Sequence, residues 1–263
     1  MRMIRIARAA LSAAAVAAAP LAAAETSFEG GYIGGSIGHS WRNSTWTTTC
    51  TGVNDGVNLL YCNTDSPRLP QGNPADIDAQ GAQFGLLAGY DMRLGGNWVG
   101  GIEADLNWAD AEGSIGNFPG TWFPGDNPAA IARNLVSVTT DWGGSLRLRL
   151  GIVTGDTLIY GTGGAAFQHV EMFGRCGAAD MVTPFCGNRP NADSATETRW
   201  GWTLGAGVET VIAADWTARV EYRYADFGDM SYTHAAGTIN EIGAEASVAT
   251  SVVTLGIVYR FGK

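Results

Sequence analysis

The feature that most constrains the fold is a two-residue alternation of apolar and polar side chains, which recurs in eight segments of the chain. This period places successive side chains on opposite faces of a β-strand. The predicted strands cover residues 31–42, 81–93, 97–109, 136–153, 157–171, 197–213, 215–227 and 248–261. We therefore predict an all-β fold of eight antiparallel strands.

The connections between these segments alternate between very short and very long. The short ones are Leu94-Gly95-Gly96-Asn97, Thr154-Gly155-Asp156 and Ala213-Ala214-Asp215, and Gly, Asn and Asp favour the tight turns of β-hairpins. The long ones are 43–80, 110–135, 172–196 and 228–247. Short turns at one end and long loops at the other are typical of up-and-down transmembrane β-barrels.

The two faces of each strand indicate which side of the barrel meets lipid. Leu146, Leu148 and Leu150 alternate with Arg147 and Arg149, and the other strands repeat this pattern. A soluble barrel would carry its polar side chains outside, so the apolar face here is expected to meet lipid and the charged face to line the lumen. A transmembrane helix is not expected, because no run of 18 apolar residues follows the first 24.

The lumen is expected to hold five acidic and five basic side chains. These are Asp91, Glu103, Asp105, Glu209, Glu221, Arg147, Arg149, Arg219, Arg223 and Arg260. The interior of an eight-stranded barrel is just wide enough for side chains to fill, and buried charges persist when they are paired. We expect an ion-pair network that fills the lumen; an ion or proton path is the alternative.

Aromatic residues near the strand ends are expected to form girdles at the membrane surfaces. The candidates are Trp98, Trp108, Trp142, Trp202, Trp216 and Tyr259. Trp98 and Trp108 share a face ten residues apart, which is about 33 Å along a strand and about 25 Å along the axis of a tilted barrel. This distance matches the height of the apolar band of an outer-membrane barrel. Scattered core aromatics are the alternative interpretation.

Residues 1–24 are predicted to be a cleavable signal peptide. Three arginines come first, an alanine-rich apolar run follows, and small residues precede Glu25; the residues concerned are Arg2, Arg5, Arg8, Ala22, Ala23 and Ala24. This order is that of an export signal, although an ordinary buried helix is the alternative. Residues 25–263 are then expected to form one outer-membrane barrel domain, with long loops extracellular and both termini periplasmic.

Charge excludes nucleic acid as a partner. Of 16 basic residues three lie in the predicted signal peptide, so 13 basic residues face 25 acidic ones in the remainder, and Lys263 is the only lysine. Nucleic-acid binding requires a basic surface, which this composition lacks.

The long connections hold twelve acidic residues against four arginines: Asp55, Asp65, Asp76, Asp78, Asp110, Glu112, Asp126, Asp180, Asp193, Asp229, Glu241 and Glu245, with Arg68, Arg133, Arg175 and Arg189. A solvated repulsive surface is expected, with cation or basic-partner binding as alternatives.

Four cysteines lie in two of the long connections. Cys50 and Cys62 are in the first, and Cys176 and Cys186 are in the third. Disulfides are expected in an exported protein, and pairing within each connection is favoured over crossed bridges. Zinc is not expected without C-x-x-C spacing or clustered histidines, and no cofactor is expected.

The aromatic segment 118–125 could anchor a surface partner, pack on its own loop or reach lipid headgroups.

Histidines offer the only general bases for an enzyme. Ser36 or Ser40 with His39 is one combination, and Asp229, Ser231 and His234 are another, with His169 apart from both. Serine beside histidine is a weak signal. A lipid-modifying enzyme is therefore kept only as an alternative, and no catalytic residue is assigned.

Several segments resemble the small outer-membrane β-barrel proteins that are labelled porin-family or surface-antigen proteins in alphaproteobacteria. The resemblance covers the whole chain after residue 24, and its carriers are Phe28–Gly35, Gly89-Tyr90, Asn97–Asp105, Arg147–Gly151, Leu158–Ala166, Val220–Tyr224 and Val258–Phe261. It implies an abundant envelope protein with structural, antigenic or host-contact roles and weak or absent pore activity. It supplies no catalytic site.

The resemblance also implies partners for assembly. Tyr259 and Phe261 resemble the terminal aromatic signal that the barrel-assembly machinery reads, although Gly262 and Lys263 follow it here. Periplasmic chaperones, this machinery and outer-membrane lipid are the expected partners, together with a surface partner of unknown kind. The first functional expectation is a non-enzymatic barrel that supports the envelope and displays its loops; a small passive porin and a surface adhesin are the alternatives.

Overall fold

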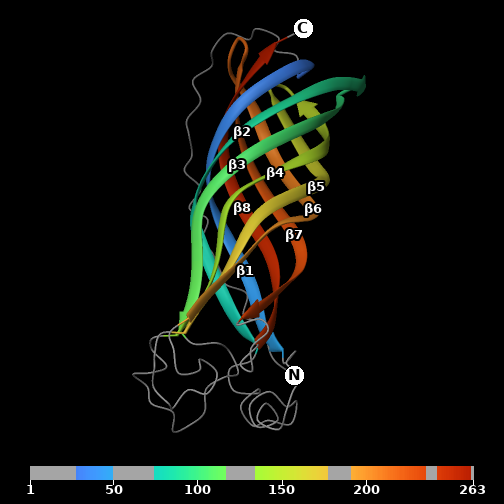
Figure 1. The fold of residues 1–263 in the computed structure, drawn as a ribbon. Helices are drawn as coiled ribbons and strands as arrows, with labels where there is room; N and C mark the ends of the chain where they lie inside the picture. Colours follow the sequence, from blue (N-terminus) through green and yellow to red (C-terminus); the bar gives the residue numbers. More distant parts are fainter. Residues whose placement is uncertain (1–27, 50–73, 117–133, 177–190, 235–241, 262–263) are drawn as a thin grey trace, which may run out of the picture.

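The computed structural model describes residues 28–49, 74–116, 134–176, 191–234 and 242–261, which form one closed β-barrel (Figure 1). The strands are β1 (Gly30–Thr49), β2 (Ala75–Gly95), β3 (Trp98–Gly116), β4 (Leu135–Thr154), β5 (Thr157–Cys176), β6 (Asn191–Ala213), β7 (Trp216–His234) and β8 (Ile242–Phe261). Each strand pairs with the next in antiparallel fashion, and β1 pairs with β8 from Gly31↔Phe261 to Thr49↔Gly243. The predicted fold class is confirmed.

The three predicted tight turns are confirmed at one end of the barrel. They join β2 to β3, β4 to β5 and β6 to β7. Gly95, Gly96 and Gly155 adopt positive φ angles of 136°, 55° and 59°, a backbone conformation that glycine adopts without steric cost. These glycines therefore allow the chain to reverse within a few residues at the β2–β3 and β4–β5 turns.

The strands extend much further toward the other end than the sequence indicated. The prediction ended the first strand at residue 42 and began the second at 81, whereas β1 ends at Thr49 and β2 begins at Ala75. The described strands have 19 to 23 residues, or roughly 60 Å at about 3.3 Å per residue, although about ten residues suffice to cross a membrane. The barrel wall thus continues well beyond an apolar band of ordinary height.

Several residues assigned to long loops consequently belong to strands. Asp76 and Asp78 lie on β2, Asp110 and Glu112 on β3, and Glu245 on β8, with exposed side chains. Asp193, Asp229 and Arg175 also lie on strands, namely β6, β7 and β5. The loop boundaries predicted at 43–80, 110–135, 172–196 and 228–247 were therefore wrong, because Gly-, Ser-, Asn- and Asp-rich strand ends resemble turns.

An apolar band covers the outer face of the barrel on the side of the tight turns. Its most exposed members include Leu148 at 70%, Ile37 at 67% and Leu86 at 61%. Arg147 and Arg149, which flank Leu148 on β4, are buried inside. The predicted assignment of apolar side chains to the outside and charged ones to the lumen matches this arrangement, which a lipid environment stabilises.

Aromatic side chains border this band at both ends. All six predicted girdle residues lie on the outer face and are partly exposed: Trp98, Trp108, Trp142, Trp202, Trp216 and Tyr259. Trp216 packs on Tyr259 near the turns, with ring centroids 5.1 Å apart. At the other border Phe84 stacks on Trp108 at 5.3 Å, and Trp142, Phe167, Trp200, Trp202 and Tyr224 continue the row. We call this second row the upper belt.

Beyond the upper belt the polarity of the wall is inverted. On β2, Asp76 and Asp78 are exposed whereas Ile77 between them is buried. The inward side chains of this region form what we call the distal apolar cluster, made of Trp46, Ile77, Val136, Val138, Val170, Met172, Met230, Tyr232, Ala244 and Ala246. Polar residues outside and apolar residues inside are the arrangement of a water-soluble barrel. One continuous sheet therefore presents an apolar outer face to lipid along the band and a polar outer face to water beyond the upper belt.

Irregular pairing is concentrated near the upper belt. Register shifts occur on β3 between Trp108 and Ala111, on β4 between Thr140 and Gly143, and on β7 between Asp226 and Asp229. The added residues bend and twist the strands locally. The change of surroundings and the change of strand geometry thus occur at the same level.

Backbone pairing stops early at two seams of the wall: the β2–β3 pairs end at Gln83↔Ala109, although β2 begins at Ala75 and β3 ends at Gly116, and the same happens at the β6–β7 seam. The described β6–β7 pairs run from Ala213↔Trp216 to Trp202↔Asp226 and no further. Beyond them, the Tyr232 hydroxyl donates to the Asp193 carbonyl at 3.0 Å, and Arg199 donates to the Asp229 carbonyl. Burial raises the pKa of Tyr232 above its ordinary value, so its hydroxyl stays protonated and can donate well into the alkaline range. Side chains therefore bridge the two distal strand edges.

Some predictions fall on residues outside the described ranges. These are the signal peptide at 1–24, the aromatic segment 118–125, and Cys50, Cys62 and Cys186, together with the side chain of Cys176. The predicted disulfides consequently remain predictions. Within the described ranges, no helix has the length and hydropathy needed to span a membrane.

A charge placed on the apolar band should destabilise the barrel. Leu148 pairs with Ile102 midway along the band, so Leu148→Lys is expected to cost about 2–4 kcal/mol in the free energy of unfolding. The matched control is Asp78→Lys on the exposed wall beyond the upper belt, which should change stability by less than about 0.5 kcal/mol. Both free-energy changes are measured with protein refolded in lipid vesicles. The vesicles are titrated with urea, and the folded fraction is followed by its heat-dependent gel shift. Equal costs would contradict the assignment of Leu148 to the lipid face.

Candidate functional site: the charged lumen

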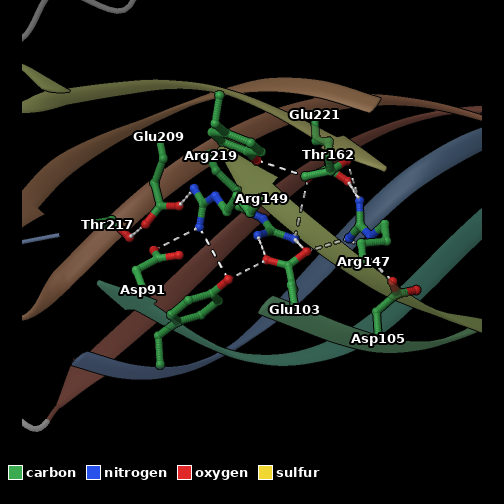
Figure 2. A network of polar contacts seen from close by, with 12 residues as sticks. Asp91, Glu103, Asp105, Arg147, Arg149, Thr162, Glu209, Thr217, Arg219 and Glu221 are labelled. Atoms are coloured by element: carbon green, nitrogen blue, oxygen red, sulfur yellow. Dashed lines mark hydrogen bonds and ion pairs between the residues drawn. The ribbon is translucent and has the colours of Figure 1, made fainter. Parts of the chain in front are cut away.

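The ten charged residues predicted for the lumen are brought together on the inner face of the barrel, and Figure 2 labels all of them except Arg223 and Arg260. They come from β2, β3, β4, β6, β7 and β8, because each occupies the inward phase of its strand. Eight of them are buried, and the side chains of Asp105 and Arg223 retain only 8% and 13% exposure. We call this set the luminal network.

The part of the network nearest the tight turns centres on Glu209. Its carboxylate accepts hydrogen bonds from Arg149, from Arg260 at 2.7 Å and from the Thr217 hydroxyl at 2.6 Å. Asp91 binds the same two arginines, with Arg260 at 3.1 Å and Arg149 at 3.3 Å. Two carboxylates and two guanidinium groups therefore neutralise one another in this layer.

The middle of the network centres on Glu103. Its carboxylate binds Arg147 and Arg219, the latter at 2.5 Å. Arg147 also binds Glu221 at 2.6 Å. Each acid is thus shared with a buried arginine, and the four charges of this layer balance.

The Glu103–Arg219 pair crosses the lumen. Glu103 is on β3 and Arg219 is on β7. In the sheet Arg219 lies opposite Glu209, yet Glu209 binds Arg149 and Arg260 instead. The ion pairs therefore connect opposite walls as well as neighbouring strands, which fills the cross-section with side chains.

Asp105 and Arg223 form the edge of the network toward the upper belt. They pair at 2.9 Å, and Arg147 reaches Asp105 at 3.3 Å. Asn107 donates to Asp105 at 3.0 Å, and the Ser145 hydroxyl also donates to it. Asp105 thereby links the edge of the network to its middle layer.

Two buried tyrosines connect the layers, and the sequence analysis did not include them. The Tyr32 hydroxyl donates to Glu103 at 3.0 Å and accepts a bond from Arg149 at 3.3 Å. The Tyr160 hydroxyl donates to Glu221 at 3.0 Å, and the Arg149 guanidinium lies 3.8 Å from the Tyr160 ring centroid. Cation–π contact and hydrogen bonding therefore supplement the ion pairs.

Glycines on the neighbouring strands make room for these rings. Tyr32 lies opposite Gly89 and Tyr160 lies opposite Gly207. A Cβ atom on Gly89 would approach Tyr32 Cζ to 2.3 Å, and one on Gly207 would approach Tyr160 Cζ to 2.5 Å. In the sequence, Gly89 and Gly207 occupy inward positions of their strands, so the inward residue beside each ring has no side chain.

The serine–histidine combinations do not form a catalytic pair in the described residues. Ser40 is buried and donates to the Gly81 carbonyl, whereas the adjacent His39 is exposed and packs on Trp41 at 4.7 Å. His169 lies on β5 and stacks on Trp142, and the side chain of His234 is outside the described set. Among the described residues, no three metal-binding side chains gather at one point.

Comparison with protein families gives a match to the model described as the outer membrane protein beta-barrel domain, over residues 9–261. A relative is the 31 kDa outer-membrane immunogenic protein of Brucella melitensis, 30% identical over 189 residues, which cover 71% of this chain and 69% of that protein. Another is the 22 kDa outer membrane protein of Rhizobium leguminosarum, 26% identical over 167 residues, with 64% and 63% coverage.

Among solved structures, the outer membrane protein OprG of Pseudomonas aeruginosa aligns over 89% of this chain and 98% of its own, at 13% identity and a TM-score of 0.48. The family match spans almost the whole chain and includes all eight strands and all ten network residues. The chain belongs to the outer membrane protein beta-barrel family.

Proposed function

We propose that this outer-membrane protein is a closed structural barrel, which supports the envelope and displays the distal end of its wall and its long connections at the cell surface. The observation that carries the proposal is the filling of the lumen at successive levels. Phe28, Val99, Leu158 and Tyr160 form an apolar cluster near the turns, the luminal network follows, and the distal apolar cluster occupies the far end.

The charge balance of the lumen supports a closed barrel over a passive porin. The network contains five acids and five arginines, each in at least one ion pair. A permeating ion would need to displace buried partners, and breaking a buried pair costs about 3–5 kcal/mol. Balanced charge also leaves little field to attract an ion of either sign.

The arrangement of the wall supports display at the surface. The apolar band lies toward the tight turns, so most of the wall that extends beyond the band carries the long connections. We place the turns and both termini in the periplasm and the long connections outside, with lipid against the band. The Brucella relative is called an immunogenic protein, which is consistent with exposure of such a surface.

Planar-bilayer recording tests the closed lumen. Protein refolded in detergent is expected to show a heat-dependent gel shift, and the same sample should produce no steady single-channel steps after insertion. A known porin inserted under identical conditions is the control for the recording. Large reproducible steps from the shifted species would show that the lumen conducts and would favour the passive porin.

The luminal network is expected to be the main polar contribution to stability. Glu103→Gln leaves Arg147 and Arg219 short of a buried counter-charge, so we expect a loss of about 3–5 kcal/mol in the free energy of unfolding. The matched control is Glu29→Gln, which removes the exposed pair between Glu29 and Arg93 and should cost about 0–1 kcal/mol. The unfolding free energies of the two variants are compared by titrating each with urea and following the folded fraction by the gel shift. A loss no larger than that of the control would show that the network is dispensable.

The terminal aromatics are proposed to direct assembly. Tyr259 and Phe261 are exposed on the outer face of β8, where the assembly machinery can reach them before closure. Phe261→Ala is expected to lower the amount of folded protein in outer-membrane fractions several-fold, while refolding of the purified chain in detergent changes little. Phe84→Ala removes an aromatic of the upper belt and is the control. An equal decrease for both variants in cells would contradict a specific signal at the C-terminus.

A further inference from the structure

Arg42 is a buried cation that the luminal network leaves without an ion pair. It lies on β1 at the level of the upper belt and is 3% exposed. Its Nε and Nη1 atoms are buried and have no hydrogen-bond partner in the described part of the chain. Such unpaired buried donors are rare in folded proteins and call for an explanation.

The charges around Arg42 do not neutralise it. Arg223, the nearest network arginine along the lumen, is already paired with Asp105 at 2.9 Å. The Asp141 carboxylate attracts Arg42, but Asp141 is exposed and leaves Nε and Nη1 of Arg42 without a hydrogen-bond partner. Since the ten network charges balance, Arg42 adds one positive charge to the described buried interior.

A hollow of about 30 Å³ adjoins the Arg42 side chain. Its lining includes Arg42, Arg223, Gln83 and Gln168, and the side-chain amides of the two glutamines can donate hydrogen bonds. The hydroxyls of Thr203 and Thr250 in the lining already donate, to the Tyr224 carbonyl and to Gln168 Oε1. A cavity of this size admits one or two water-sized species. The hollow thus combines an unpaired guanidinium, further donors and room for a small guest.

The hollow is bounded along the lumen on both sides. The luminal network lies toward the turns, with Asp105 and Arg223 at its edge. Toward the distal end, Phe227, Ala225, Ala166 and Val248 form an apolar cluster that adjoins it. These neighbours limit the contact of a bound ion with bulk water along the lumen, so its attraction to Arg42 is screened less than that of an exposed pair.

We propose that this hollow binds one small monovalent inorganic anion of the size of chloride, with Arg42 as its counter-charge and Arg223 and the amide groups of Gln83 and Gln168 as further donors. Water could occupy the donors but would supply no negative charge. A hollow of about 30 Å³ fits one ion of this size better than sulfate, which has four oxygen atoms to accommodate. The bound anion would complete the charge balance of the buried interior, and the site does not depend on whether the barrel conducts.

Refolding in defined salts tests the site. Wild-type protein is refolded in detergent at constant ionic strength while gluconate is replaced by chloride, and the thermal midpoint of the gel shift is measured. Because a ligand that binds only the folded state stabilises it, chloride should raise the midpoint progressively until the site is saturated. Arg42→Met should abolish this dependence. Arg93→Met, at an exposed arginine on β2, should retain it.

Several outcomes would overturn the proposal. A wild-type midpoint that does not respond to chloride would mean that the hollow contains water only. A dependence that persists in Arg42→Met would place the effect elsewhere. Equal stabilisation by sulfate would contradict this preference in size.

If Arg42→Met does not fold, wild-type crystals grown in bromide decide the question. An anomalous peak within hydrogen-bond reach of the Arg42 guanidinium supports the site. The absence of a peak there, with bromide visible elsewhere, overturns it.

Discussion

The closure of β1 on β8 is the constraint on which the rest of the structure depends. Hydrocarbon offers no partner for backbone N–H and C=O groups, so a sheet that crosses it must leave no open edge. With eight strands, closure also fixes a lumen that side chains can fill. Along the apolar band the outward face meets lipid, so the charged residues point into the lumen. They are stable there only when they form ion pairs with one another.

The luminal network shows what such confinement requires. Asp91 and Glu209 share Arg149 and Arg260, and Glu103 connects to Arg219 across the barrel. Small inward residues then become as important as charged ones, since Gly89 and Gly207 admit the rings of Tyr32 and Tyr160. The interior behaves as a packed polar core, in which each side chain restricts the positions of its neighbours.

Sequence reasoning identified the fold, the turns and the ten network residues because strand alternation assigns each residue to a face. It could not identify which charges pair, since Arg219 passes over its cross-strand neighbour Glu209 to reach Glu103. It also missed Arg42, whose surroundings on β1 are Ser, Trp and Asn. The strand ends were missed because beyond the belt the alternation continues with inverted polarity, as in Asp76-Ile77-Asp78.

The early end of backbone pairing at the β6–β7 seam has a consequence for the form of the distal wall. Backbone pairing forces two strands into one register, and a slip by one residue would exchange their faces. Beyond Trp202↔Asp226, contacts such as the one between Tyr232 and the Asp193 carbonyl tie the strands together without such a register. On their other edges these strand ends remain paired, β6 with β5 and β7 with β8, and the β2–β3 pairs also end early, at Gln83↔Ala109. The described distal wall is therefore two four-stranded sheets, β3–β6 and β7–β8–β1–β2, which continue from one closed barrel.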